Sequence, residues 1–173
     1  MTEKQANILK AALELFATEG FSAVATSKIA KRAGVSEGLI FKHFGNKEKL
    51  LAAVLDQGYE QAGKHLANVL LSTDPKEVIR KAIELPFMVD KEEKVFWRLT
   101  YSLKWQQDAY DESRMEPLKI SLENAFKKLG YEQPELETEL LLVYFDGVAT
   151  KLLLHKEKDT SLLKDFILSR YKL

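Results

Sequence analysis

Apolar residues recur at intervals of three and four positions along most of the chain, and this spacing predicts amphipathic helices. The first helix is expected to begin at Thr2, because the Thr2 hydroxyl and the Gln5 side chain can form a capping box. Gly20 is placed to end this helix. Alternating runs rich in valine or threonine, which would predict strands, are missing from the sequence. The pattern therefore predicts an all-α protein.

Three further helices follow closely within the N-terminal part of the chain. We expect the second to start near Thr26, whose hydroxyl can cap free backbone N–H groups, and to end at Gly34. Ser36 is expected to cap a third helix that runs to Phe44, and Asn46 to cap a long fourth helix. The same signals predict later helices over residues 74–86, 92–108, 118–129, 134–155 and 160–171.

The composition fits a soluble protein with a hydrophobic core. Of the 173 residues, 46% are hydrophobic and 30% are charged. Cysteine is absent, which excludes disulfides, thiolate zinc sites and cysteine nucleophiles. Charged residues interrupt the first twenty positions, and no apolar run approaches the roughly 18 residues of a membrane helix. We therefore expect a cytoplasmic protein.

The net charge of zero hides an uneven distribution. Residues 1–50 contain eight basic and five acidic residues, whereas the rest of the chain contains 18 basic and 21 acidic ones. Between Thr26 and Lys49, six basic residues stand against two acidic ones. Local positive charge of this kind suits a polyanion such as DNA, although a solvated helix face can have the same composition.

The segment from Ser27 to Phe44 has the pattern of two short helices joined by a compact turn. Gly34 can adopt a positive φ without a Cβ clash, which permits a turn of three or four residues. Such a pair matches the helix-turn-helix signature, in which the second helix enters the major groove of DNA. Other helical hairpins can share this pattern. The apolar residues expected to hold the two helices together are Ile29, Ala30, Ala33, Val35, Ile40 and Phe44.

A longer pattern around this segment is more specific. It consists of Gly20-Phe21, Thr26, Ile29-Ala30, Ala33-Gly34-Val35-Ser36, Phe41-Lys42-His43-Phe44 and Lys47-Glu48-Lys49-Leu50. Over about residues 2–62 the sequence resembles the tetracycline-repressor (TetR) family of bacterial transcriptional regulators. The resemblance implies an N-terminal three-helix bundle with the helix-turn-helix, here residues 1–48. It also implies a C-terminal helical domain for ligand binding and dimerisation, here residues 49–173.

The resemblance further implies how such a protein works. Members of the family act as homodimers on a pseudo-palindromic operator in double-stranded DNA, usually as repressors released by a small ligand. Two recognition helices must then reach half-sites about 34–36 Å apart. We expect the same partners for this chain.

Eleven residues receive DNA-contacting roles from the resemblance. Those implied to hold phosphates are Thr26, Ser27, Lys28 and Lys47, and those implied to meet the groove are Ser36, Glu37, Gly38, Leu39, Lys42 and His43. Phe41 stands where the family commonly has tyrosine, so it keeps a ring contact but lacks a hydroxyl for a phosphate. Lys42 can donate to guanine and Leu39 can touch a thymine methyl group. Lys47 has independent support, since a helix N-terminus favours phosphate.

The C-terminal two thirds of the chain offers candidates for an effector site and for a dimer interface. The aromatic candidates for ligand binding are Phe87, Trp97, Tyr101, Trp105 and Tyr144. They suit an apolar effector of unknown identity, and equally a packed aromatic core. The last two predicted helices are apolar over much of their circumference, so we expect them to form the homodimer interface. An intrachain core is the alternative.

A helical-bundle enzyme is disfavoured because the sequence lacks the motifs of that class. No glutamate stands three positions before His43, His65 or His155, as a di-iron bundle requires. Phosphate-loop and dinucleotide-binding motifs are also missing. We therefore expect no catalytic residue, no metal site and no cofactor. The remaining alternative is a helical interaction protein that keeps the fold but has lost specific DNA binding.

Overall fold

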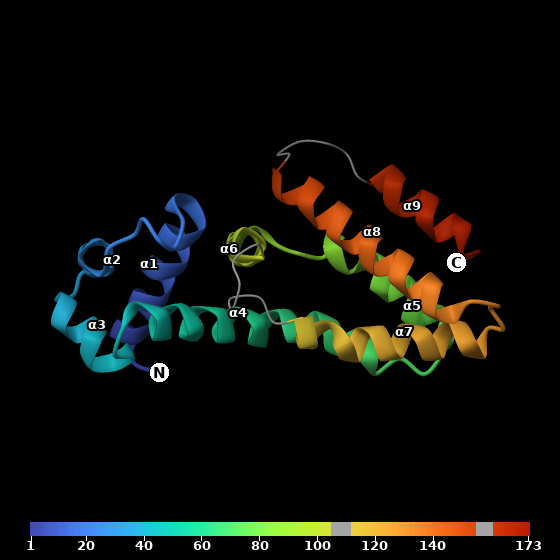
Figure 1. The fold of residues 1–173 in the computed structure, drawn as a ribbon, viewed down its shortest axis with the longest axis horizontal. Helices are drawn as coiled ribbons and strands as arrows, with labels where there is room; N and C mark the ends of the chain where they lie inside the picture. Colours follow the sequence, from blue (N-terminus) through green and yellow to red (C-terminus); the bar gives the residue numbers. More distant parts are fainter. Residues whose placement is uncertain (105–111, 155–160) are drawn as a thin grey trace. The chain divides into compact units, whose positions relative to one another are not determined.

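The computed structural model describes residues 1–104, 112–154 and 161–173, and within these ranges it contains helices and no strand (Figure 1). The all-α prediction is confirmed. The α-helices are α1 (Glu3–Glu19), α2 (Thr26–Ala33), α3 (Glu37–Phe44), α4 (Lys47–Leu70), α5 (Pro75–Glu84), α6 (Lys91–Leu103), α7 (Glu116–Lys128), α8 (Pro134–Leu154) and α9 (Ser161–Arg170). Two short 3-10 helices are η1 (Leu85–Phe87) and η2 (Glu112–Met115).

The described residues fall into two compact units. Unit 1 comprises residues 1–61 and 90–104, and unit 2 comprises residues 62–89, 112–154 and 161–173. α4 contributes residues to both units. The division into functional domains after residue 48 remains a prediction.

Unit 1 is organised around α1. This helix packs against α2 and α6, and α2 packs against α3. The fully buried side chains at the centre of the unit include Ile8, Phe16, Ile29, Ile40 and Leu50. Because Ile40 belongs to α3 and Leu50 to the first turn of α4, both helices are attached to the core by their inner faces. The outer face of α3 is left free of the core.

Local capping accounts for most helix ends in unit 1. Thr2 and Gln5 form the predicted capping box, and the backbone N–H of Lys49 donates to Asn46 Oδ1 over 2.8 Å. Two of the predicted side-chain caps are missing. Thr26 is the first residue of α2 and not its cap, because Ala25 takes the N-cap position without a side-chain bond. Ser36 occupies the N-cap position of α3, but its hydroxyl makes no capping bond.

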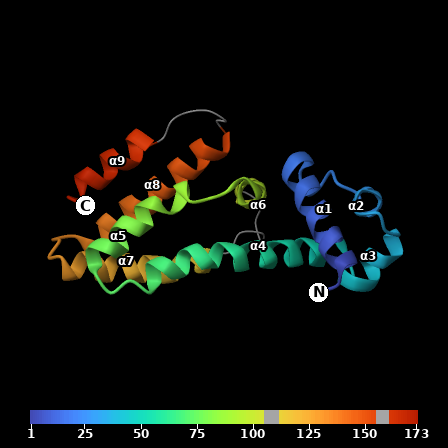
Figure 2. The same cartoon turned by 180° about the vertical axis from the view of Figure 1, so that it is seen from behind.

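Unit 2 has its own core, formed by α5, α7 and α8. α5 packs against both α7 and α9, and α7 packs against α8 (Figure 2). The fully buried side chains include Ile79, Ile83, Leu118, Leu122 and Phe126. α5 begins as predicted, with an Asp74 cap followed by Pro75, and gives way at Leu85 to η1, which contains Pro86. None of the helices in the described ranges has the length and apolarity that a membrane span needs.

Candidate nucleic-acid interface

The turn between α2 and α3 depends on one glycine. Gly34 has a φ of 67°, in the left-handed region, and the next residue, Val35, donates its N–H to the Ala30 carbonyl over 3.0 Å. A Cβ added at Gly34 would meet no atom within 4 Å, so the backbone conformation, and not crowding, requires glycine here. The turn brings the start of α3 close to the start of α2.

α3 has a buried face and an exposed face. Ile40 is fully buried, as predicted, and Phe44 is half-buried. The other face carries the exposed residues Glu37, Gly38 and Lys42, together with Phe41, whose side chain is 46% exposed. The two remaining groove candidates, Leu39 and His43, are half-buried, and the exposed Ser36 lies just before the helix. A large exposed ring beside an exposed lysine is suited to contact with DNA.

Two basic residues of α2 are paired with acids of α1. Lys28 Nζ lies 2.5 Å from Glu19 Oε2, and Arg32 Nη2 lies 2.7 Å from Glu14 Oε2. These side chains are exposed, so the pairs contribute little to stability and exchange readily with other anions. Lys42, by contrast, has no acidic partner within 4.0 Å among the described residues. Its charge is available to a ligand.

The first residues of α2 and α3 are joined by a side-chain hydrogen bond. Thr26 Oγ1 donates to Glu37 Oε1 over 2.5 Å. Ser27, the next residue of α2, is exposed. The resemblance gave Thr26 a phosphate and Glu37 a place in the groove, and the structure brings these two side chains together.

The beginning of α4 lies beside the same surface. Lys47 Nζ lies 4.5 Å from the centroid of the Phe21 ring and donates to the Ser22 carbonyl over 3.3 Å. A cation over an aromatic face is attracted by the ring quadrupole. Within α3, His43 Nδ1 lies 3.4 Å from Gln5 Nε2 of α1. The contacts with Phe21 and Ser22 hold Lys47 at the N-terminus of α4, where the helix backbone also favours anions.

All eleven DNA-contacting candidates therefore belong to one unit, on α2, α3, the turn before α3 and the first turn of α4. The sequence analysis missed the acidic partners Glu14 and Glu19. No local signal identifies them, because each is separated from its basic partner along the chain and the pairing depends on how α1 packs against α2.

The five effector candidates are not gathered in either unit. Trp97 and Tyr101 belong to unit 1, whereas Phe87 and Tyr144 belong to unit 2. Trp105 lies outside the described residues. In unit 1, Trp97 forms part of an aromatic cluster with Tyr59 and Phe96, in which the ring centroids lie 5.1–6.4 Å apart.

Two hydroxyl groups of α8 are buried without a partner among the described residues. They are Thr138 Oγ1 and the Tyr144 hydroxyl. Burial raises the pKa of Tyr144 to about 12, so the hydroxyl stays protonated and can donate at neutral pH. Buried hydroxyls usually have a hydrogen-bond partner, and these two are sites where a bound molecule could provide one. Thr138 was missed by the sequence analysis, since threonine within a helix gives no distinctive pattern.

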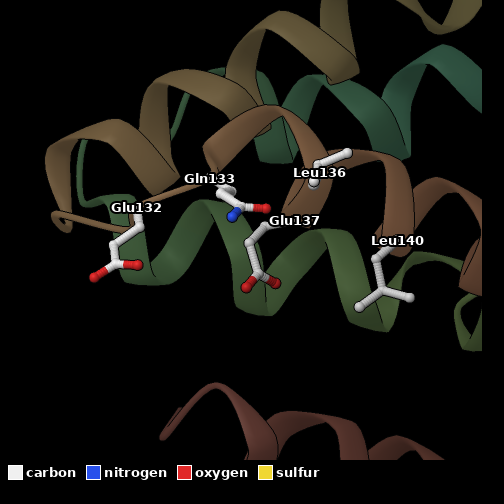
Figure 3. A pocket seen from close by; sticks show the side chains of 5 residues that line it. All are labelled: Glu132, Gln133, Leu136, Glu137 and Leu140. Carbon is white, nitrogen blue, oxygen red and sulfur yellow. The ribbon is translucent and has the colours of Figure 1, made fainter.

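A shallow pocket of about 440 Å³ lies at the start of α8 (Figure 3). It is lined by Glu132, Gln133, Leu136, Glu137 and Leu140. None of these is an effector candidate from the sequence. In the described part of the chain, no group of three or more His, Cys, Asp or Glu side chains is arranged to hold a metal ion.

Known proteins with similar sequences or folds indicate which family the helix-turn-helix segment resembles. The family model described as bacterial regulatory proteins, tetR family, matches residues 8–54, which span most of α1, all of α2 and α3 and the start of α4. Residues 8–54 of the chain thus match the TetR family. The chain is 42% identical over 82 residues to the HTH-type transcriptional repressor Rv3405c of Mycobacterium tuberculosis, a match that covers 47% of this chain and 42% of the relative. The match thus spans less than half the length of that relative.

Solved structures share the fold over nearly the whole chain. A TetR-like transcriptional regulator from Rhodococcus sp. RHA1 has a TM-score of 0.83 at 21% identity, covering 96% of this chain and 92% of its own. A transcriptional regulator from Saccharomonospora viridis, solved with choline, has a TM-score of 0.77 at 18% identity, covering 99% and 96% of the two chains. At these identities the similarity establishes the fold.

Proposed function

We propose that this protein is a sequence-specific DNA-binding regulator of transcription that acts as a repressor and has no catalytic activity. The observation that carries the proposal is the exposed face of α3, on which an unpaired Lys42 and an exposed Phe41 follow a glycine turn. The named repressor function of the relative Rv3405c supports the same conclusion. The protein acts in the cytoplasm, where bacterial DNA is found.

In the proposed complex α3 lies in the major groove. Lys42 donates to guanine and Leu39 contacts a thymine methyl group. Ser27, Lys28 and Lys47 contact phosphates at the starts of α2 and α4, and these contacts set the position of the protein without reading sequence. Lys28 has to exchange Glu19 for a phosphate, which costs little because the ion pair is exposed.

The proposed functional unit is a homodimer formed through α8 and α9. α8 exposes Leu136, Leu140 and Val143 at 59–62%, and these residues lie at intervals of four and three along one face. α9 exposes Leu162 and Phe166 at 75% and 60%. Exposed apolar surface of this extent marks an interaction site. Leu136 and Leu140 also line the pocket of Figure 3, so the second subunit would cover it.

A small apolar effector is proposed to control DNA binding from unit 2. The unpartnered hydroxyls of Thr138 and Tyr144 support this, because a ligand could accept or donate hydrogen bonds there. Choline in the structure from Saccharomonospora viridis shows that a relative of the same fold holds a small molecule. An effector releases the protein from DNA only if it binds the DNA-free form more tightly than the DNA-bound form.

The test is fluorescence anisotropy with DNA from upstream of the protein's own coding region, at two salt concentrations and with random-sequence competitor. We expect selective, salt-sensitive binding by the wild-type protein. Lys42→Ala should weaken selective binding roughly 5- to 150-fold, since one good base contact discriminates by that factor. Lys128→Ala is the matched control, because it removes the same charge from an exposed position in unit 2.

If the upstream DNA binds no better than random DNA, selection from a random library decides the matter. Failure to select any sequence would contradict the proposal and favour an interaction protein with the same fold. Equal losses in Lys42→Ala and Lys128→Ala would show that α3 has no special role.

A further inference from the structure

Thr26 and Glu37 interact across the turn between the two helices of the motif. Thr26 is the first residue of α2 and Glu37 the first residue of α3, and the hydroxyl of Thr26 donates to Glu37 Oε1 over 2.5 Å. This length is typical of a hydroxyl bound to an ionised carboxylate. A threonine hydroxyl carries a single hydrogen, so the bond uses its donor capacity. In this arrangement the Thr26 hydroxyl has no hydrogen left to donate to a DNA phosphate.

The carboxylate of Glu37 keeps most of its acceptor capacity. The residue is exposed, and no basic side chain lies within 4.0 Å of it among the described residues. An ionised carboxylate offers about four lone-pair positions, of which Thr26 occupies one. Thr26 therefore holds the side chain in place without neutralising its charge.

The surroundings of Glu37 are open on the side where α3 meets solvent. A Cβ added at Gly38 would meet no atom within 4 Å. Phe41 lies one turn further along the same face, and the exposed Lys42 follows it. The N-terminal residues of a recognition helix are those that contact base edges. α3 thus presents a held acceptor at its start and a free donor one turn later.

The chemistry of the major groove determines which base suits this acceptor. Cytosine presents only its N4 amine, which donates, whereas guanine and thymine present acceptors and adenine presents an amine beside the N7 acceptor. A carboxylate accepts from cytosine N4 and is repelled by the acceptors of the other bases.

We propose that Glu37 is a specificity-determining residue that selects cytosine at one position of each half-site, and that Thr26 is the positioning residue that holds its carboxylate. The inference rests on the DNA-binding function proposed above and names one element of the sequence that the protein reads. In this proposal the Thr26 hydroxyl binds Glu37 instead of the phosphate that the resemblance implied.

The experiment is selection from a random DNA library, run in parallel for the wild-type protein, Glu37→Gln, Thr26→Val and Thr26→Ser. The wild-type profile should show cytosine at one position of each half-site. Glu37→Gln should lower the preference for cytosine over guanine there by roughly 5- to 150-fold and shift it towards adenine, with which an amide forms two hydrogen bonds. Other positions should keep their preferences.

The two threonine variants separate positioning from phosphate binding. Thr26→Val should reduce the cytosine preference by roughly twofold to tenfold, as expected for the loss of one hydrogen bond, while affinity for random DNA stays unchanged. Thr26→Ser keeps the hydroxyl and should restore the preference. A phosphate contact would behave differently, since its loss weakens binding to all sequences equally.

Each outcome has a definite meaning. A wild-type protein that selects no sequence would overturn the proposed function and this inference with it. A wild-type protein that selects a sequence, with an unchanged profile in Glu37→Gln, would overturn the inference alone. Uniform weakening by Thr26→Val would also overturn the positioning role. Circular dichroism of each variant confirms that it is folded, and Glu37→Gln decides the question if Thr26→Val does not fold.

Discussion

Two buried threonines show how much depends on a single hydrogen bond. Thr100 and Thr138 are 3% and 0% exposed, and both lie within helices. The Thr100 hydroxyl donates to the Phe96 carbonyl over 3.1 Å, whereas Thr138 Oγ1 has no partner among the described residues. A buried polar group without a partner costs roughly 1–3 kcal/mol. Thr138 therefore lowers the stability of the ligand-free protein.

Thr138→Val should raise the free energy of unfolding by about 1 kcal/mol, because valine has a similar shape and removes the unpaired hydroxyl. Urea denaturation followed by circular dichroism measures this change. Thr100→Val is the matched control. It should lower the free energy of unfolding by about 1 kcal/mol relative to the wild type, since it removes an existing hydrogen bond. Stabilisation by both substitutions alike would show that the missing hydrogen-bond partner of Thr138 is not the cause.

At the scale of the helix, one close approach in unit 1 explains a glycine that no turn requires. Gly58 lies inside α4, and a Cβ added there would lie 2.1 Å from Phe96 Cδ2 on α6. Real Cβ atoms do not come this close to a ring, and Phe96 is itself 4% exposed and packed against Tyr59. Gly58 thus permits the Phe96 ring of α6 to rest directly on the backbone of α4.

Gly58→Ala should lower the free energy of unfolding by about 1–3 kcal/mol, the usual cost of overpacking a filled core. In an exposed helix the same change would be stabilising by about 1 kcal/mol, so the sign of the effect is diagnostic. Thermal or urea denaturation provides the measurement.

A second substitution tests the stated cause. Phe96→Leu removes ring atoms that the new Cβ would meet, so Gly58→Ala should cost less in the Phe96→Leu background than in the wild type. Equal costs in both backgrounds would show that Phe96 is not the obstacle.

At the scale of the whole molecule, the exposed leucines of α8 form part of the proposed dimer interface. Leu140→Glu places a charge in the middle of the proposed interface and should weaken dimerisation at least tenfold, a change of about 1.4 kcal/mol. Sedimentation velocity at micromolar concentration detects the shift from dimer to monomer. Binding to a DNA site with two half-sites should weaken as well, because each subunit provides one α3.

Leu71→Glu is the control for this prediction. Leu71 is 80% exposed and apolar but lies just after α4, outside the last two helices. It should leave the dimer intact. A wild-type protein that is monomeric at micromolar concentration would contradict the proposed interface.

The sequence by itself determined where most helices begin and end. The Thr2–Gln5 capping box, the Asn46 cap and the Asp74-Pro75 start were all predicted and are all present. Each depends on atoms within three residues of one another, so the local sequence contains the whole interaction. Gly34 belongs to the same class, because its backbone conformation is a property of the turn.

Only the tertiary structure decided which side chains meet. The bond from Thr26 to Glu37, the ion pair of Lys28 with Glu19 and the contact of Gly58 with Phe96 join residues on different helices. Helical periodicity tells which face of a helix is apolar, but not which face of another helix it will touch or at what depth. For that reason the sequence could name candidate DNA-contacting residues, but it could not show that Thr26 bonds to Glu37 or that Lys28 pairs with Glu19.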